Sequence, residues 1–288
     1  MNIYDIAKLA NVSIATVSRV VNNSPKVSPK TKEKVLAVMK ENEYTPNAFA
    51  RGLGLGSMKT VGIICPNIDD IYMAKAVSYL EQNLHAHGYD CILGCSGFKQ
   101  EEKEDYVRLL LSKQIDTLIL VGSTYAGNGK DESDTDYIRE AAEQVSIFMI
   151  NAKVSGDNIY CTYADDFQAT YEVTKAFIRR GKEKILFMYD SESYSARQKM
   201  AGYEAALQDA GYPIRGNLKF KTKNDIEYTR DMLLEYNRTL DFDSVLATED
   251  GIAIGAVKYA KIKGLAIPEE LAVVGYNNSI LAISSDPE

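Results

Sequence analysis

The sequence predicts an all-α N-terminal head followed by an α/β core of two lobes, each built on a doubly wound parallel sheet. Residues 2–44 are helical in pattern and contain no strand-like run. From Val61 onward, short apolar runs alternate with longer amphipathic segments, which is typical of parallel strands covered by helices on both faces. A length of 288 residues also favours more than one domain.

The N-terminal part of the chain and the remainder also differ in net charge. Residues 1–60 hold nine Lys and Arg against four Asp and Glu, a balance of +5. The whole chain carries −7, so the remaining residues balance at −12. A basic head on an acidic body is expected when only one end of a protein meets a polyanion.

Three helices account for the head. Residues 3–10 place apolar side chains on one face of a first helix, which ends at Asn11, one of the few non-glycine types that tolerate a left-handed turn. Ser13 is a good N-cap for a second helix over 14–22, and a third helix is expected over 28–43. Two short helices joined by a tight turn are typical of a helix-turn-helix.

The second helix carries side chains that are suited to reading DNA. Arg19 can reach the two acceptors of guanine, and Ile14 and Ala15 can contact thymine methyl groups. Short polar side chains beside them suit phosphate oxygens. The predicted DNA contacts of this helix and its cap are Ser13, Ile14, Ala15, Thr16, Ser18, Arg19 and Asn22. The alternative is a small helical cap with no ligand, which the positive charge of the head disfavours.

The core consists of two similar halves. We expect strands at 61–66, 89–95, 116–122 and 146–151 in one lobe and at 184–189, 244–248 and 271–276 in the other. Helices are expected at 72–87, 101–114, 134–144, 165–180, 195–210, 226–236 and 251–263. Ligands of open α/β sheets bind beyond the carboxyl ends of the strands, which predicts a ligand site in the cleft between the lobes.

A dense motif runs through the head and beyond it. Residues 3–53 read IYDIAKLANVSIATVSRVVNNSPKVSPKTKEKVLAVMKENEYTPNAFARGL. This stretch resembles the DNA-binding head of the LacI/GalR transcription regulators, and the resemblance continues through the core as periplasmic-binding-protein-like lobes. It implies a homodimer on palindromic double-stranded operator DNA, with a small-molecule effector in the cleft that tunes DNA affinity. It adds four positions to the predicted DNA contacts, namely Tyr44, Asn47, Ala50 and the minor-groove wedge Leu53.

The motif also divides the chain into expected segments. These are a DNA-binding domain at 1–45, a hinge helix and linker at 46–60, a first lobe at 61–162 and a second lobe at 163–288.

The linker reads ARGLGLGS over 50–57, so glycines alternate with leucines in a segment where a helix should begin. Each glycine in a helix interior costs about 1 kcal/mol relative to alanine, and a helix this short is marginal in water. We expect it to fold only when two copies pack in the minor groove and Leu53 unstacks the central step.

The resemblance extends to the effector cleft, which needs a stacking surface and a few oriented polar groups. Tyr72 is expected to supply the aromatic surface, Asp165 to lie at the lip of the second lobe, and Arg197 to clamp ligand hydroxyls or a carboxylate. The predicted effector contacts are Tyr72, Asp165, Arg197, Glu249, Asp250 and Asn277. Each could instead have only a surface or capping role.

Asn277 departs from the family, in which an aspartate commonly follows the aromatic residue at this point. An amide can donate as well as accept but carries no negative charge. The amide at this position weakens the expectation that the effector is a simple neutral sugar held by carboxylates, but it does not exclude such an effector.

Other chemistry finds little support in the sequence. The four cysteines form no CxxC pair and there are two histidines, so a metal site is not expected, and the thiols suit a reducing cytoplasm. GxSxG, GxxxxGK[ST], HExxH and a strand-following GxGxxG are absent, so neither an enzyme nor a cofactor is expected. We also expect no signal peptide and no membrane span.

Members of the family usually continue for some tens of residues beyond the position of Glu288. We therefore expect a second lobe that is incomplete at its C-terminus. A chain without the family's tail should be less stable or dimerise differently, because edge strands and apolar surface stay uncovered.

The leading interpretation is a cytoplasmic, nucleoid-associated regulator that represses transcription and is controlled by a small metabolite such as a sugar. One alternative is a regulator that depends on a small corepressor or on a partner protein acting as corepressor. Another is a sugar-binding sensor without operator function. The sign of the effector's influence on operator affinity separates the first two.

Overall fold

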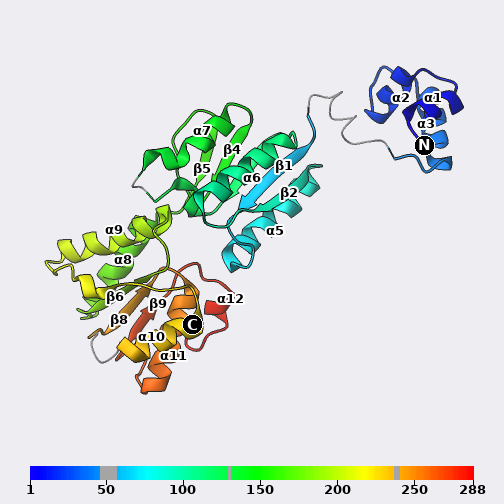
Figure 1. The fold of residues 1–288 in the computed structure, drawn as a ribbon. Helices are drawn as coiled ribbons and strands as arrows, with labels where there is room; N and C mark the ends of the chain where they lie inside the picture. The colour runs from blue at the N-terminus through cyan, green and yellow to red at the C-terminus, as the bar shows by residue number, and fades with distance from the viewer. Residues whose placement is uncertain (46–56, 129–130, 237–240) are drawn as a thin grey trace.

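The computed structural model describes residues 1–45, 57–128, 131–236 and 241–288. The predicted fold class is confirmed, with a helical head at the N-terminus and two α/β lobes after it (Figure 1). Among the residues that the structure describes, no helix has both the length and the apolar character needed to cross a membrane. The predicted hinge helix, with its glycines, lies outside the described residues.

The head is a three-helix unit with a small apolar core. Its helices are α1 (Ile3–Leu9), α2 (Ile14–Val21) and α3 (Pro29–Glu41). Asn11 has a φ of 50°, as the turn after α1 requires, and the hydroxyls of Ser13 and Ser28 accept from backbone N–H groups of the helices they cap. The buried residues of the head core are Ile6, Ala7, Ala10, Val17, Val20, Val35 and Met39.

The first lobe has a five-stranded parallel sheet in the order β2-β1-β3-β4-β5. Its strands are β1 (Thr60–Cys65), β2 (Asp90–Cys95), β3 (Thr117–Val121), β4 (Ser146–Ile150) and β5 (Ile159–Thr162). Its helices are α5 (Ile71–Ala86), α6 (Gln100–Ser112) and α7 (Asp136–Ala142), with 3-10 turns at Ser123–Ala126 and Glu132–Thr135. Helix α5 packs against one face of the sheet, and α6 and α7 pack against the other.

The second lobe has a four-stranded parallel sheet in the order β7-β6-β8-β9. Its strands are β6 (Ile185–Tyr189), β7 (Lys219–Lys221), β8 (Ser244–Ala247) and β9 (Ala272–Val274). Its helices are α8 (Asp166–Arg179), α9 (Tyr194–Asp209), α10 (Ile226–Tyr236), α11 (Asp250–Lys263) and α12 (Ile280–Ile283), with a 3-10 turn at Gly216–Leu218. Helices α8 and α9 cover one face of the sheet and α10 and α11 the other.

The burial of each strand follows its place in the sheet. The central strand β8 is buried at every residue, and so is β1 after its first residue, because helices cover both faces. The outer strands β2 and β5 are mostly half-buried or exposed. Helices and loops that follow the carboxyl ends of the strands in both lobes face the space between them, and this arrangement positions the cleft (Figure 1).

Candidate functional site

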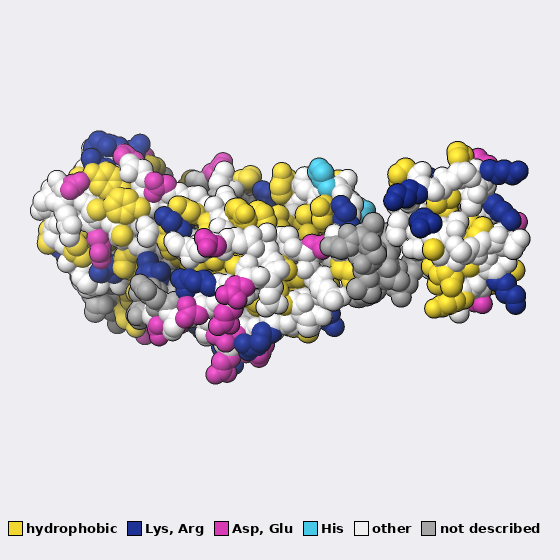
Figure 2. All heavy atoms as spheres, turned by 90° about the horizontal axis from the view of Figure 1, so that it is seen from above, with side chains coloured by type: hydrophobic (Ala, Val, Ile, Leu, Met, Phe, Trp, Pro, Cys, Tyr) yellow, Lys and Arg dark blue, Asp and Glu magenta, His cyan; other side chains and the backbone are white. Residues whose placement is uncertain are grey.

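The head presents one side of α2 to solvent. Val17 and Val20 point into the head core, whereas Ile14, Ala15 and Arg19 are exposed. The predicted base-reading side chains therefore share an exposed surface, and Lys and Arg side chains are prominent on the head in Figure 2.

The remaining head residues have more mixed surroundings. The hydroxyl of Ser13 caps α2 and hydrogen-bonds the hydroxyl of Thr16 at 2.8 Å. Ser18 and Asn22 are half-buried, and Tyr44 packs against the head core. Three further predicted DNA contacts, Asn47, Ala50 and Leu53, lie outside the described residues.

A cavity of about 600 Å³ opens between the two lobes, where the sequence predicts it. Its walls come from loops and helix starts that follow strands in both lobes. Residues of the first lobe that line it include Asn67, Asp70, Tyr72, Met73, Phe98 and Thr124. Residues of the second lobe include Asp190, Ser193, Ser195, Lys199, Asn224, Thr248, Glu249, Asp250 and Asn277. Four of the six predicted effector residues, namely Tyr72, Glu249, Asp250 and Asn277, therefore line the cleft.

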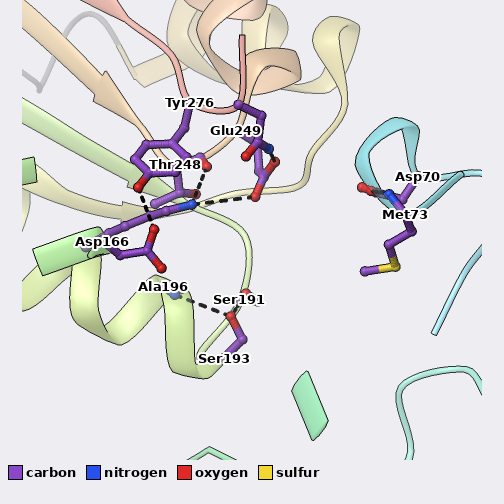
Figure 3. A network of polar contacts seen from close by, with 11 residues as sticks. Asp70, Met73, Asp166, Ser191, Ser193, Ala196, Thr248, Glu249 and Tyr276 are labelled. Carbon is purple, nitrogen blue, oxygen red and sulfur yellow. Dashed lines mark hydrogen bonds and ion pairs between the residues drawn. The ribbon is translucent and has the colours of Figure 1, made fainter. Parts of the chain in front are cut away.

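Lys199, on α9, is the cation at the floor of this cleft, and its exposed fraction is 3%. Its Nζ donates to the carbonyl of Thr248 at 3.0 Å, lies 4.0 Å from Oε1 of Glu249, and stands 3.6 Å from the ring centroid of Tyr276. Figure 3 labels these three partners. Burial lowers the pKa of Lys199, while the surrounding carboxylates, Glu249 first, oppose that change.

Carboxyl groups surround Lys199. Burial raises the pKa of Glu249 to about 8, with Lys199 opposing and Asp190, Asp70 and Asp250 adding to the rise. Burial also raises the pKa of Asp190. Asp70 belongs to the first lobe and Glu249 to the second, and Figure 3 shows them on opposite sides of the cleft. Carboxyl groups of the two lobes therefore face one another across the space that a ligand would fill.

The side-chain amide of Asn277 takes part in the polar contacts of the cleft. Its Nδ2 donates to Oε2 of Glu249 at 2.7 Å. An aspartate could not donate at this point and would add another negative charge beside Glu249. The amide is thus matched to the crowded carboxyls around it.

Comparison with known proteins identifies the family. Residues 2–47 match the model described as "Bacterial regulatory proteins, lacI family". Residues 58–283 match the model described as "Periplasmic binding proteins and sugar binding domain of LacI family". The chain belongs to the LacI family. It is a DNA-binding transcriptional regulator and not an enzyme.

Relatives and solved structures agree with this assignment. An HTH-type transcriptional regulator of Lachnoclostridium phytofermentans is 47% identical over 100% of this chain and 86% of its own length. Catabolite control protein A of Priestia megaterium is 30% identical over 100% of this chain and 86% of its own. A Lac repressor dimer bound to operator and the anti-inducer ONPF superposes with a TM-score of 0.86 at 23% identity, covering 99% of this chain and 84% of that one.

A second solved structure, the transcriptional regulator CelR in complex with cellobiose, superposes with a TM-score of 0.67 at 24% identity, and covers 100% of this chain and 86% of that one. At these identities the two structures show the shared fold.

Two predicted effector residues of this LacI-family regulator are not among the residues that line the cleft. Asp165 is exposed and caps α8, accepting from the N–H of Gln168 at 2.9 Å. Its neighbour Asp166 is the one that turns inward, with 2% exposure and a hydrogen bond from the hydroxyl of Tyr276. Adjacent residues near the start of a helix point in different directions, so a shift of one position changes the role.

Arg197, the predicted clamp for the effector, hydrogen-bonds backbone carbonyls in this structure. Its Nη1 donates to the carbonyl of Glu192 at 2.8 Å and to that of Gly127, in the first lobe, at 3.2 Å. Two positions on a helix are separated by about 200°, so Arg197 and Lys199 point to different sides of α9. The sequence contained the signal for Lys199, because Ala196, Lys199 and Gly202 are spaced by three and share the buried face.

The half-buried carboxyl of Glu249 makes the stability of the LacI-family core depend on pH. Its folded pKa of about 8 lies above the ordinary value of 4.5. A carboxyl shifted in this direction contributes stability that is complete below its unfolded pKa and is lost as the pH rises through its folded pKa. We expect Glu249→Gln to reduce the fall in unfolding free energy between about pH 5 and pH 9 by about 1–3 kcal/mol.

Urea denaturation of the ligand-free protein across this range measures the effect. Glu140→Gln, at an exposed site on α7, is the matched control and should leave the pH dependence as it is in the wild type. Identical pH dependence in wild type and Glu249→Gln would contradict the assigned role of Glu249.

Proposed function

We propose that this protein is a homodimeric, cytoplasmic repressor that binds a palindromic operator and whose operator affinity is set by a polyhydroxylated metabolite in the cleft. The observation that carries the proposal is the presence, in one chain, of an exposed recognition surface on α2 and a cavity of about 600 Å³ lined by both lobes. A ligand that contacts both lobes favours one relative arrangement of them over another.

The domain boundaries predicted above follow the same logic. The end of β5 at Thr162 and the start of α8 at Asp166 support a boundary between a first lobe at 61–162 and a second lobe at 163–288. The residues between the head and the first lobe connect the two functions. A ligand that changes how the first lobes of a dimer are arranged changes whether two linkers meet over the operator.

The relatives are consistent with this proposal. The Lac repressor is bound as a dimer to operator and an anti-inducer, and CelR is bound to cellobiose. We extend to this chain the pairing of operator DNA with a carbohydrate-class effector. Coupling between the two ligands must be reciprocal, so effector and operator change each other's affinity by the same factor.

Selection of bound DNA from a random pool, with and without a metabolite mixture, tests the function directly. We expect an enriched palindromic site whose recovery changes when the metabolites are present. Enrichment of no palindromic site would contradict operator binding. Recovery that increases rather than decreases with metabolites would favour the corepressor-dependent alternative.

Arg19→Ala tests the recognition helix. Arg19 is exposed on α2, and loss of a guanine contact should weaken operator binding by about 1–3 kcal/mol and relax the preference at one base pair. Binding titrations against the selected operator and its single-base variants measure both effects. Arg179→Ala, at an exposed site on α8, should leave binding unchanged. Full affinity and unchanged preference in Arg19→Ala would contradict a base contact by Arg19. In the sensor without operator function, Arg19→Ala would leave all cellular behaviour unchanged.

A further inference from the structure

The charge in the cleft is far from balanced. The carboxyl side chains that line the described cavity are Asp69, Asp70, Asp190, Asp225, Glu227, Glu249 and Asp250. In the same described set of lining residues, Lys199 is the one Lys or Arg. An empty cleft therefore holds several more potential negative charges than positive ones.

Lys199 is committed to groups of the protein. Its Nζ donates to the carbonyl of Thr248 and stands over the ring of Tyr276, and the Glu249 carboxyl is 4.0 Å away. An anionic ligand would have to compete with these partners for the cation. It would also enter a space where Asp190 and Glu249 are already disfavoured as anions by burial.

Carboxyl groups of both lobes line the cavity, and some of them accept backbone hydrogen bonds. Asp70 accepts from the N–H of Met73 at 2.9 Å and Asp250 from the N–H of Ser279 at 2.6 Å. Asp190 and Glu249 are half-buried beside them, and repulsion from neighbouring carboxyls adds to the rise that desolvation causes in the pKa of each. A cation placed among these four groups would relieve that repulsion from both lobes at once.

An independent observation indicates that the ligand of this cavity also carries hydroxyl groups. Thr248 and Ser195 line it with 2% and 4% exposure, and their hydroxyl oxygens have no hydrogen-bond partner within the described part of the chain. The buried hydroxyl oxygen of Thr124, from the first lobe, is in the same situation there. Buried polar groups are normally hydrogen-bonded, so these three are matched to donors and acceptors on a ligand.

We propose that the cleft selects a polyol that carries a protonated amine, of the amino sugar class, and disfavours phosphorylated or carboxylated sugars. The amine lies among Asp70, Asp190, Glu249 and Asp250, and the hydroxyls of the ligand pair with Thr124, Ser195 and Thr248. Tyr72, which is half-buried at the mouth of the same cavity, provides an aromatic surface for the sugar ring. This inference rests on the proposed function only in taking the cleft as the effector site.

Matched sugar pairs test the charge preference. The probes are glucosamine with glucose, galactosamine with galactose and mannosamine with mannose, together with glucose 6-phosphate and glucuronate, titrated into the full chain by calorimetry at about pH 6.5. We expect the amino member of at least one pair to bind at least tenfold more tightly than its hydroxyl counterpart, and neither anionic sugar to bind. Equal or tighter binding of the neutral members, binding of an anionic sugar, or no binding of any amino sugar at millimolar concentration overturns the proposal.

The pH dependence of binding provides a second readout. Glu249 is faced by Lys199 from α9, Asp190 from the loop after β6, Asp70 from the first lobe, and Asp250 and Asn277 beside it. Because its folded pKa is about 8, binding of an ammonium group beside it displaces a proton. Affinity for the amino sugar should rise between about pH 5.5 and pH 7, approaching tenfold per pH unit. An affinity that is constant over this range, or falls, contradicts the proposed location of the amine.

Two variants test which carboxyl groups cause the preference for an amino sugar. Glu249→Gln should bring the affinity ratio within the responding pair toward one and remove the pH dependence, and Asp190→Asn should act in the same direction if Glu249→Gln does not fold. Glu140→Gln, exposed on α7, should change neither. Retention of the full amine preference in both cleft variants overturns the proposal. Operator selection on the same preparation keeps the two proposals apart, because loss of operator binding with an intact amine preference contradicts only the regulatory function.

Discussion

Ile6→Ala should unfold the head and abolish operator binding while the two-lobed core stays folded. Ile6 is fully buried in α1, among the residues of the head core that come from all three head helices. Truncation of a buried isoleucine to alanine costs about 2–5 kcal/mol, because apolar contacts are lost and a cavity remains. A unit of this size buries a smaller fraction of its surface than a larger domain and has little stability in reserve.

Thermal melting followed by circular dichroism, together with operator titration, measures both consequences. The variant should lose the helical signal of the head and its operator affinity, while the melting of the core and binding of its ligand remain as in the wild type. Leu9→Ala on the same helix is the control, since Leu9 is 54% exposed and its truncation should change stability by about 0.5 kcal/mol or less. Wild-type operator affinity in Ile6→Ala would contradict the placement of Ile6 in the head core.

Gly202→Ala should destabilise the second lobe by about 1–3 kcal/mol. Helices α8 and α9 approach so closely at this point that an added Cβ would lie 2.1 Å from the carbonyl oxygen of Phe167 and 2.5 Å from Oγ1 of Thr170. The first of these is a backbone atom, so the helices must separate to accept the methyl group. Separation would also break the hydrogen bond that Thr170 donates to the carbonyl of Lys199 at 2.8 Å, which helps to position the floor of the cleft.

Gly216→Ala is a matched control, because an added Cβ there meets no atom within 4 Å. Urea denaturation should show a large loss of stability for Gly202→Ala and almost none for Gly216→Ala. Ligand binding should weaken only in the first variant, since α9 carries Lys199. Equal stability of the two variants would show that α8 and α9 can move apart freely, contrary to their packing in the structure.

Several elements follow directly from local pattern. The run TVGIIC of β1 is apolar along its length because both faces of a central parallel strand are covered, and the sequence alone identifies it as buried. The strands β5 (Ile159–Thr162) and β7 (Lys219–Lys221) were not predicted. Each is short, lies at a sheet edge and mixes polar with apolar residues, so its assignment depends on the neighbouring strand rather than on its own composition.

The head and the cleft differ in how much of their structure can be predicted from local sequence. Caps, turn residues and the apolar faces of α1 to α3 are set within a few positions of one another, so the helix-turn-helix and its exposed side were predictable from the residues. The general place of the cleft was predictable too, because parallel strands always bring their carboxyl ends to one edge. Which of Arg197 and Lys199 enters that cleft was not.

That choice depends on how α9 rotates against α8 and the second sheet. The close approach at Gly202 fixes this rotation, and it turns Lys199 inward and Arg197 toward Glu192 and Gly127. The raised pKa of Glu249 likewise comes from burial and from carboxyls on separate loops and lobes. Family, fold class and the helix-turn-helix are therefore readable along the chain, whereas the charge of the cleft arises only when distant segments pack together, because burial and long-range contacts have no local signature.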